Sequence, residues 1–130
     1  MQDVFPPLSG LVLTFTDFGA QGPYLGQIEA LIRARVPRAQ LVDLLNNAPV
    51  CAPRQSAYLL AALLPYLPTR SIILAVVDPG VGSDRAALLV ETGGFVLLGP
   101  DNGLMALAVR RFAPARVHRI LWRPEGLSTS

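Results

Sequence analysis

The sequence of 130 residues is long enough for one domain with a sizeable core, but short for a complete two-domain enzyme. Hydrophobic residues make up 52% of the chain and charged residues only 15%, so we expect a buried sheet and some apolar surface covered by another domain or subunit. The net charge is only +2, and the 11 basic residues, all arginine, are spread along the chain, so no nucleic-acid partner is predicted.

The cysteine content and the apolar segments predict a cytoplasmic protein. Cys51 is the only cysteine, so no internal disulfide can form and a reducing compartment is expected. Residues 1–10, a predicted extension, lack the basic and apolar regions of a signal peptide. The longest apolar stretch, residues 57–67, contains Pro65 and is too short to cross a bilayer, so no membrane partner is predicted.

Strands and helices alternate along residues 11–122. The hydrophobic pattern predicts a strand over 11–16, a helix over 23–36, a strand over 40–45, a helix over 53–64 and a strand over 71–77. A pair of strands over 86–91 and 95–98, a short helix over 104–111 and a last strand over 116–122 follow, before a tail over 123–130. The helix over 53–64 is apolar on nearly every side after Ala57, so we expect it to be buried on two faces. The alternation predicts an α/β domain with a mainly parallel sheet flanked by helices.

Two carboxylates fall at predicted carboxyl ends of strands, where ligands bind in such sheets. Asp17 follows the first strand and is followed by Phe18 and Gly19. A carboxylate there can accept hydrogen bonds from both hydroxyls of a ribose, but a helix cap or an Asx turn explains it equally well. Asp43 lies inside the second strand, so for it we favour a partnered or edge position.

The second carboxylate, Asp78, opens a turn that contains Pro79, Gly80 and Gly82. The two glycines permit a backbone geometry that lets a small ligand approach the main chain closely. Arg85 follows seven positions later, and a folded-back turn would pair it with Asp78. Such a pair can hold and polarise a water molecule, although an ordinary surface ion pair is the alternative.

Other polar or reactive residues carry weaker signals. His118 in the predicted last strand is expected to pack or to lie on the surface, and no cluster with metal-ligand spacing is present, so no metal is predicted. Cys51 has no activating neighbour in the sequence and is expected to be a small packed side chain. Asn102 and Gly103 predict a tight turn or a helix cap, with no further role.

Four motifs in order resemble one family, the S-adenosylmethionine (SAM) hydroxide adenosyltransferases, which are related to the SAM-dependent fluorinase and chlorinase. The motifs span residues 13–19, 22–26, 78–85 and 99–104: Leu-Thr-Phe-Thr-Asp-Phe-Gly, Gly-Pro-Tyr-Leu-Gly, Asp-Pro-Gly-Val-Gly-Ser-Asp-Arg and Gly-Pro-Asp-Asn-Gly-Leu. The resemblance implies a Rossmann-like three-layer N-terminal domain that hydrolyses SAM to adenosine and L-methionine by hydroxide attack at the ribose C5′. No cofactor is implied, since SAM is the substrate.

The resemblance also implies a role for each matching residue. Asp17 would hold the ribose hydroxyls, and Asp78 and Arg85 would be two members of an Asp–Arg–His set that activates the water. Val81 would contact the substrate, and Cys51 would stand where relatives often carry an aromatic wall of the pocket. The halogenating relatives lack the aspartate of this turn, so the presence of Asp78 favours hydroxide over halide.

Two features of the family do not appear in the sequence. The catalytic histidine of the family lies in a Phe-His-Gly-Arg-Asp segment that would begin near Ser130, and His118 does not match it. The C-terminal β-barrel domain, which contributes to the site across a trimer interface, is absent too. We therefore expect a truncated portion that is inactive alone and belongs to a homotrimeric longer protein. A non-catalytic nucleoside-binding module and a SAM-dependent halogenase remain the alternatives.

Overall fold

The computed structural model describes residues 8–80, 84–123 and 125. Its six strands are β1 (Leu11–Thr16), β2 (Gln40–Leu45), β3 (Ser71–Val76), β4 (Ala87–Thr92), β5 (Phe95–Pro100) and β6 (Ala115–Arg119). Its helices are α1 (Tyr24–Arg35), α2 (Pro53–Leu63) and α3 (Ala106–Arg111), and α2 continues into a short 3-10 turn, η1 (Leu64–Tyr66). The predicted elements are all present, although the last strand ends at Arg119 and not at residue 122.

The six strands form one mixed sheet in the order β2-β1-β3-β5-β4-β6. The first four of these strands are parallel to one another, whereas β4 is antiparallel to both β5 and β6. The reversal at β4 follows from its short connection to β5 through Gly93 and Gly94, because a connection of this length can join only antiparallel neighbours. The predicted α/β class with a mainly parallel sheet is therefore confirmed.

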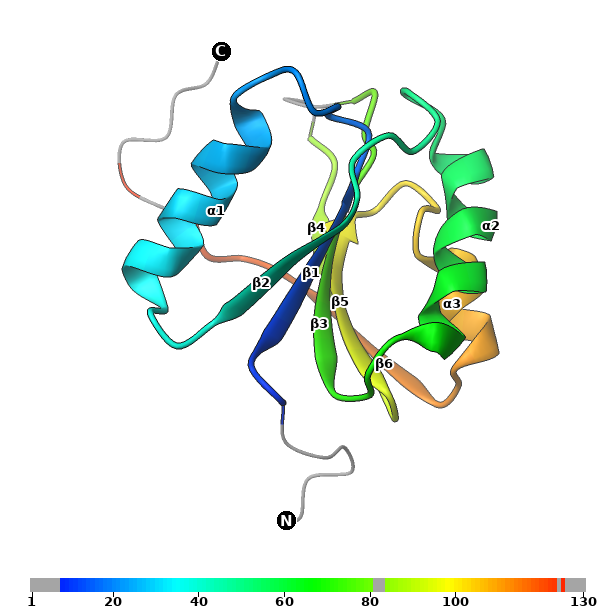
Figure 1. Cartoon of the computed structure of the whole chain (residues 1–130). Helices are drawn as coiled ribbons and strands as arrows, with labels where there is room; N and C mark the ends of the chain where they lie inside the picture. The colour runs from blue at the N-terminus through cyan, green and yellow to red at the C-terminus, as the bar shows by residue number, and fades with distance from the viewer. Residues whose placement is uncertain (1–7, 81–83, 124, 126–130) are drawn as a thin grey trace.

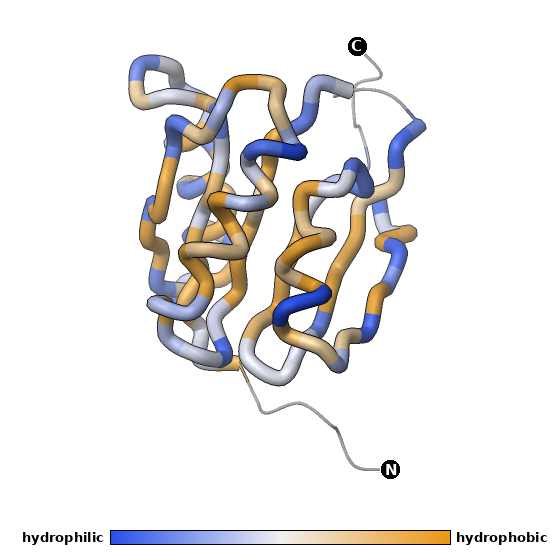
Figure 2. Tube along the Cα trace, turned by 90° about the vertical axis from the view of Figure 1, so that its right-hand side faces the viewer, coloured by the Kyte–Doolittle hydropathy of each residue, from blue (hydrophilic) through white to orange (hydrophobic). Residues whose placement is uncertain are grey.

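The helices cover the two faces of the sheet unequally. In Figure 1, α1 lies on one side of the sheet, and α2 and α3 lie together on the other. Figure 2 shows that hydrophobic residues follow the strands. The largest fully buried side chains include Phe15, Leu60, Leu64, Ile73, Leu97 and Leu104. No residue of α1 is buried, so the main core lies between the sheet and the α2–α3 layer.

Helix α2 is buried on one face only, which corrects the expectation of two buried faces. Its buried residues are Ser56, Ala57, Leu60 and Ala61. Tyr58 and Leu59 point away from the core and are 68% and 37% exposed. Nothing in the described part of the chain covers this second side, because the sheet and α3 both lie on the buried side of the helix.

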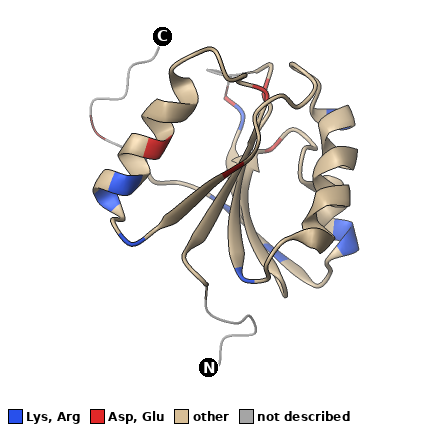
Figure 3. Cartoon of the chain, viewed as in Figure 1, with Lys and Arg blue, Asp and Glu red and all other residues tan. Residues whose placement is uncertain are grey.

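Acidic residues gather near the carboxyl ends of the central strands, while most of the arginines lie elsewhere on the molecule (Figure 3). The register of the parallel strands explains part of this pattern. Thr16, the last residue of β1, pairs with Val76, the last residue of β3. Asp17 and Asp78 follow these two residues closely, so both carboxylates lie at the same edge of the sheet, as the sequence predicts.

Candidate active site

Asp17 stands in the loop after β1, and its carboxylate bonds to a loop far along the chain. The backbone N–H of Cys51 donates a hydrogen bond of 2.8 Å to Asp17 Oδ2. Helix α1 begins at Tyr24 with Pro23 as its cap, so Asp17 is not the helix cap that was one of its two alternatives. Its one hydrogen bond in the described part of the chain crosses 34 positions, which also differs from a local Asx turn.

The loops after β1 and β2 are tied together beside Asp17. Gly19 N–H donates to the carbonyl oxygen of Asn46 at 2.7 Å, and Ala48 N–H donates to that of Thr16 at 3.0 Å. These backbone bonds hold the two loops in place without using the second carboxylate oxygen of Asp17. Asp17 is half-buried, so part of the carboxylate faces solvent, where a ligand could reach it.

Cys51 lies in the same loop, but not as expected. The thiol is free and the residue is exposed, so the prediction of a small packed side chain is wrong. The physical reason lies in the backbone, because Cys51 has a φ of 54°, in the left-handed region that side chains rarely adopt. This conformation turns its N–H toward Asp17 and its side chain toward solvent.

Asp78 and Arg85 form the predicted ion pair. Arg85 Nη1 lies 3.2 Å from Asp78 Oδ1, and the side chains of Arg85 and Asp78 are 32% and 11% exposed. The backbone N–H of Gly80 donates a second hydrogen bond to Oδ1, at 2.9 Å. The low exposure of the carboxylate distinguishes this contact from an ordinary surface ion pair. Val81, the remaining predicted contact in this turn, lies outside the described residues.

Asn102 completes the surroundings of Asp78, and the sequence reasoning assigned it no such role. Its Nδ2 donates to the carbonyl oxygen of Val77 at 2.8 Å and lies 3.5 Å from Asp78 Oδ1. Its Oδ1 accepts a hydrogen bond from Leu104 N–H at 3.0 Å. The tight turn predicted here is present, and Gly103 has a φ of +88°. The position of Asn102, just after the end of the parallel strand β5, was the available signal.

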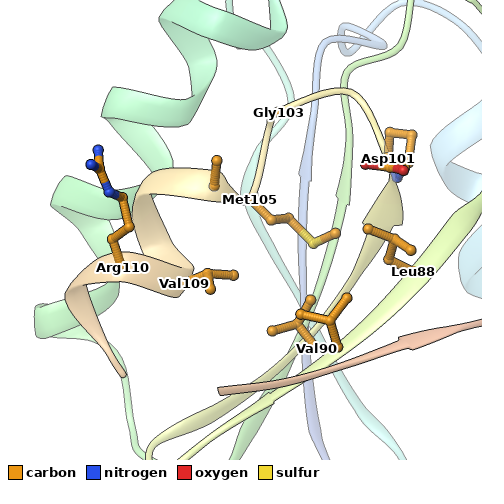
Figure 4. Close-up of a pocket in the computed structure, with 10 residues that line it drawn as sticks. Leu88, Val90, Asp101, Gly103, Met105, Val109 and Arg110 are labelled. Carbon is orange, nitrogen blue, oxygen red and sulfur yellow. The ribbon is translucent and has the colours of Figure 1, made fainter. Parts of the chain in front are cut away.

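A hollow of about 430 Å³ lies between α2 and the start of α3, with Tyr58 and Asn102 among its lining residues. Two further hollows lie near this end of the sheet, on opposite faces. The first, of about 350 Å³, lies beside Asp78 and Arg85 and is otherwise mostly apolar, lined by Leu74, Val76, Leu98 and Ile120 among others. The second, of about 270 Å³, lies between α3 and strands β4 and β6, with Val90, Met105 and Val109 on its walls (Figure 4). Of these three hollows, only the one beside Asp78 and Arg85 includes a predicted site residue.

His118 and Asp43 lie away from these carboxylates, as expected. His118 is half exposed on the edge strand β6, with Nε2 3.8 Å from Glu91 Oε2, which confirms its surface position. Asp43 lies on the edge strand β2 and accepts a hydrogen bond from Asn46 Nδ2 at 2.8 Å, so its predicted partnered position is also confirmed. In the described ranges, no three His, Cys, Asp or Glu side chains form a group that could hold a metal.

Comparison with known sequences identifies proteins that are related to this chain. Residues 12–130 match the family described as SAM hydroxide adenosyltransferase N-terminal domain. The chain is 43% identical over 97 residues to a protein of Thermus thermophilus named (R)-S-adenosyl-L-methionine hydrolase, covering 75% of this chain and 38% of that protein. A protein of the same name from Methanocaldococcus jannaschii is 31% identical over 115 residues, with coverage of 85% and 43%. The chain thus spans about two fifths of the length of these curated relatives.

Solved structures agree with the sequence matches. A conserved hypothetical protein from Thermus thermophilus superimposes with a TM-score of 0.77 at 39% identity, covering 88% of this chain and 47% of that one. An uncharacterised conserved protein from Thermotoga maritima gives a TM-score of 0.75 at 27% identity, with coverage of 82% and 42%. The α/β fold is therefore shared with both.

Proposed function

Because this chain belongs to the SAM hydroxide adenosyltransferase family, we propose that it supplies the nucleoside side of an active site that hydrolyses S-adenosyl-L-methionine to adenosine and L-methionine. The observation that carries the proposal is the Asp78–Arg85 pair, with 3.2 Å between Oδ1 and Nη1 and a carboxylate side chain that is 11% exposed. Curated relatives with the name SAM hydrolase support the same reaction. The matched region makes up only 38% of the Thermus thermophilus relative, so we propose the whole reaction for the longest polypeptide that the gene encodes.

The reaction balances without a cofactor. The oxygen of a water molecule forms a bond to the ribose C5′, and the bond between C5′ and the sulfonium sulfur breaks. The electron pair of that bond stays on sulfur, which leaves as the neutral thioether of methionine, and the proton of the water passes to the site and then to solvent. A neutral thioether needs no acid to leave, so the work of the protein is to align the substrate and to prepare the water.

We assign the two carboxylates different tasks in this reaction. Asp17 accepts the N–H of Cys51 through Oδ2, and its carboxylate would also accept hydrogen bonds from the ribose hydroxyls. Asp78, with Arg85, would hold the attacking water and take up its proton. Val81 and the exposed Cys51 are proposed contacts with the substrate, in the two loops that follow β3 and β2.

The charge of Asp78 favours water over halide as the nucleophile. A carboxylate attracts the protons of a water molecule, whereas it repels a halide ion by several kcal/mol at contact distance in a site of intermediate polarity. A halogenase would need this position free of negative charge, so we propose hydrolysis and not halogenation.

The proposal also covers the cellular location and the oligomeric state of the protein. In the described residues no helix has both the length and the apolar character that crossing a membrane requires. We propose a cytoplasmic location, which would keep the exposed thiol of Cys51 reduced. We also propose that residues 11–122 act as the SAM-binding domain of a homotrimer, a role that the exposed Tyr58 and Leu59 on α2 support.

The test uses the longest polypeptide that the gene encodes, incubated with SAM in water enriched in oxygen-18. Adenosine and methionine should appear in equal amounts, with the label in the 5′-hydroxyl of adenosine, because the water oxygen attacks C5′. Binding of SAM by calorimetry without any product would overturn hydrolysis in favour of a nucleoside-binding module. Formation of a 5′-halo-adenosine that depends on chloride or fluoride would favour a halogenase.

A further inference from the structure

One oxygen of Asp78 receives all the hydrogen bonds that the described residues make to this carboxylate. Oδ1 faces three donors: the backbone N–H of Gly80 at 2.9 Å, Arg85 Nη1 at 3.2 Å and Asn102 Nδ2 at 3.5 Å. Within the described ranges, no hydrogen bond reaches Oδ2. The carboxylate is therefore anchored through one oxygen, and the other is available to a ligand.

The side chain of Asn102 is itself held at three points. Its carboxamide donates to Val77 O at 2.8 Å and accepts from Leu104 N–H at 3.0 Å, so both ends of the planar group are fixed. The carboxamide nitrogen carries two N–H groups, and besides Val77 O it also lies 3.5 Å from Asp78 Oδ1. Hydrogen bonds of this length are common in unliganded active sites and shorten when the substrate binds.

We propose that Asn102 is a positioning residue: it acts with Gly80 and Arg85 to fix Oδ1 of Asp78, so that Oδ2 is the oxygen that holds the attacking water. This inference rests on the proposed function, since it assigns the geometry of the same site. Asparagine suits the task because it offers a donor and an acceptor in one rigid plane, and no charge that would compete with Arg85.

The backbone around Asn102 supports this assignment. Strand β5 approaches β3 so closely at Gly99 that a Cβ atom there would collide with the carbonyl oxygen of Ala75. This approach brings the loop after β5 alongside the end of β3, where Val77 and Asp78 lie. Gly103, with its φ of +88°, then turns the chain into α3 directly after Asn102. Asn102 is thus held by main-chain geometry on both sides.

Asn102→Asp is the informative variant because it removes the donors of the side chain and keeps its acceptor. Aspartate has the same shape and still accepts from Leu104 N–H, but it lacks the N–H donors and places a second negative charge beside Asp78. Asn102→Ala removes the acceptor as well. Asn46→Asp is the matched control, since Asn46 Nδ2 also donates to a carboxylate, that of Asp43, at 2.8 Å on the edge strand.

The first measurement is amide hydrogen exchange at Gly80, followed by NMR in the 130-residue chain, which needs no turnover. Because the Gly80 N–H donates to Asp78 Oδ1, its exchange reports on the position of that carboxylate. Exchange should become about fivefold faster or more in Asn102→Asp and Asn102→Ala, and stay unchanged in Asn46→Asp. Unchanged exchange at Gly80 in both Asn102 variants would overturn the inference, whatever the enzyme does.

The second measurement is adenosine release by the longest polypeptide that the gene encodes. Both Asn102 variants should lose about tenfold or more in kcat, with KM for SAM within about threefold of wild type. Both variants lose donor hydrogen bonds and should lower Tm, and Asn102→Ala also loses the bond from Leu104 N–H. Because kcat is measured well below both melting temperatures, a kcat loss that merely follows the fall in Tm would overturn a positioning role. If the Asn102 variants exchange faster at Gly80 but the wild-type polypeptide itself releases no adenosine, the inferred geometry stands and the proposed function is refuted.

Discussion

The loops after β1 and β3 each carry one carboxylate of the site, and the protein holds the two in different ways. Asp17 accepts one hydrogen bond, from the N–H of Cys51, in the described part of the chain. Asp78 receives donors from three separate segments, at Gly80, Arg85 and Asn102. A carboxylate that accepts one hydrogen bond can still adjust to bind a large ligand. A carboxylate that faces three donors is held in position before any ligand binds.

This difference corresponds to the two tasks that the reaction sets. Binding a ribose involves two hydroxyl groups on a rigid ring, and the ligand itself can align the carboxylate. A water molecule has no such rigidity, so its direction of approach to C5′ depends on the protein. A fixed carboxylate therefore aligns the water better than a mobile one would. The comparison therefore assigns binding to the end of β1 and activation of the nucleophile to the end of β3.

The largest effect is expected from Asp78→Asn, which keeps the shape of the side chain and removes its charge. Adenosine release by the longest polypeptide that the gene encodes should fall by about a thousandfold, because the water loses its proton acceptor, while KM for SAM changes by less than about threefold. Steady-state kinetics with chromatographic detection of adenosine measures both. An equal loss in kcat and in SAM affinity would contradict the assignment of Asp78 to activation of the water and of Asp17 to binding.

Asp17→Asn should show the opposite balance. The amide keeps an acceptor for Cys51 N–H, but it loses the charge that strengthens hydrogen bonds to the ribose hydroxyls, so adenosine affinity should fall by about tenfold or more. Isothermal calorimetry gives the dissociation constant, and 2′-deoxyadenosine is the matched ligand. If the variant and the wild type discriminate equally between the two nucleosides, Asp17 does not contact the ribose.

Gly99→Ala probes the backbone that supports the Asp78 end. The added Cβ would meet the carbonyl oxygen of Ala75 within the sheet, so the variant should lose about 1–3 kcal/mol in free energy of unfolding. Urea denaturation of the 130-residue chain measures the loss. Gly26→Ala in α1 is the control, because open space surrounds that position and alanine favours a helix by up to about 1 kcal/mol. Equal stability of the two variants would contradict the close approach of β5 to β3.

The smallest effect is expected at Cys51, on the Asp17 side. Its φ of 54° disfavours a branched side chain, so Cys51→Val should lower the free energy of unfolding by about 1–2 kcal/mol. Cys51→Gly should stay within about 1 kcal/mol of wild type, because glycine adopts this conformation freely but gains entropy on unfolding. Thermal denaturation of both variants checks the order, and a valine variant as stable as the glycine one would show that this loop is not held as described.

Much of the fold was predictable because it depends on local patterns. Apolar runs and helical spacing located the strands and helices, and the two-glycine connection before Phe95 indicated a pair of strands, which the structure shows to be antiparallel. The last strand was predicted too long, because Ile120 and Trp122 continue its hydrophobic pattern although β6 ends at Arg119. The outer side of α2 was predicted buried from composition, which cannot show whether a partner covers an apolar face.

The positions of Asp17 and Asp78 at strand ends were determined by the sequence alone, since a strand boundary is a local property and parallel strands end at one edge. The pairing of Asp78 with Arg85 followed from seven residues of spacing around a glycine-containing turn. What only the tertiary structure decided were contacts between distant segments: Cys51 N–H on Asp17, across 34 positions, and Asn102 beside Asp78, across 24. Such contacts depend on how strands pack beside one another, and one sequence carries no direct record of that packing.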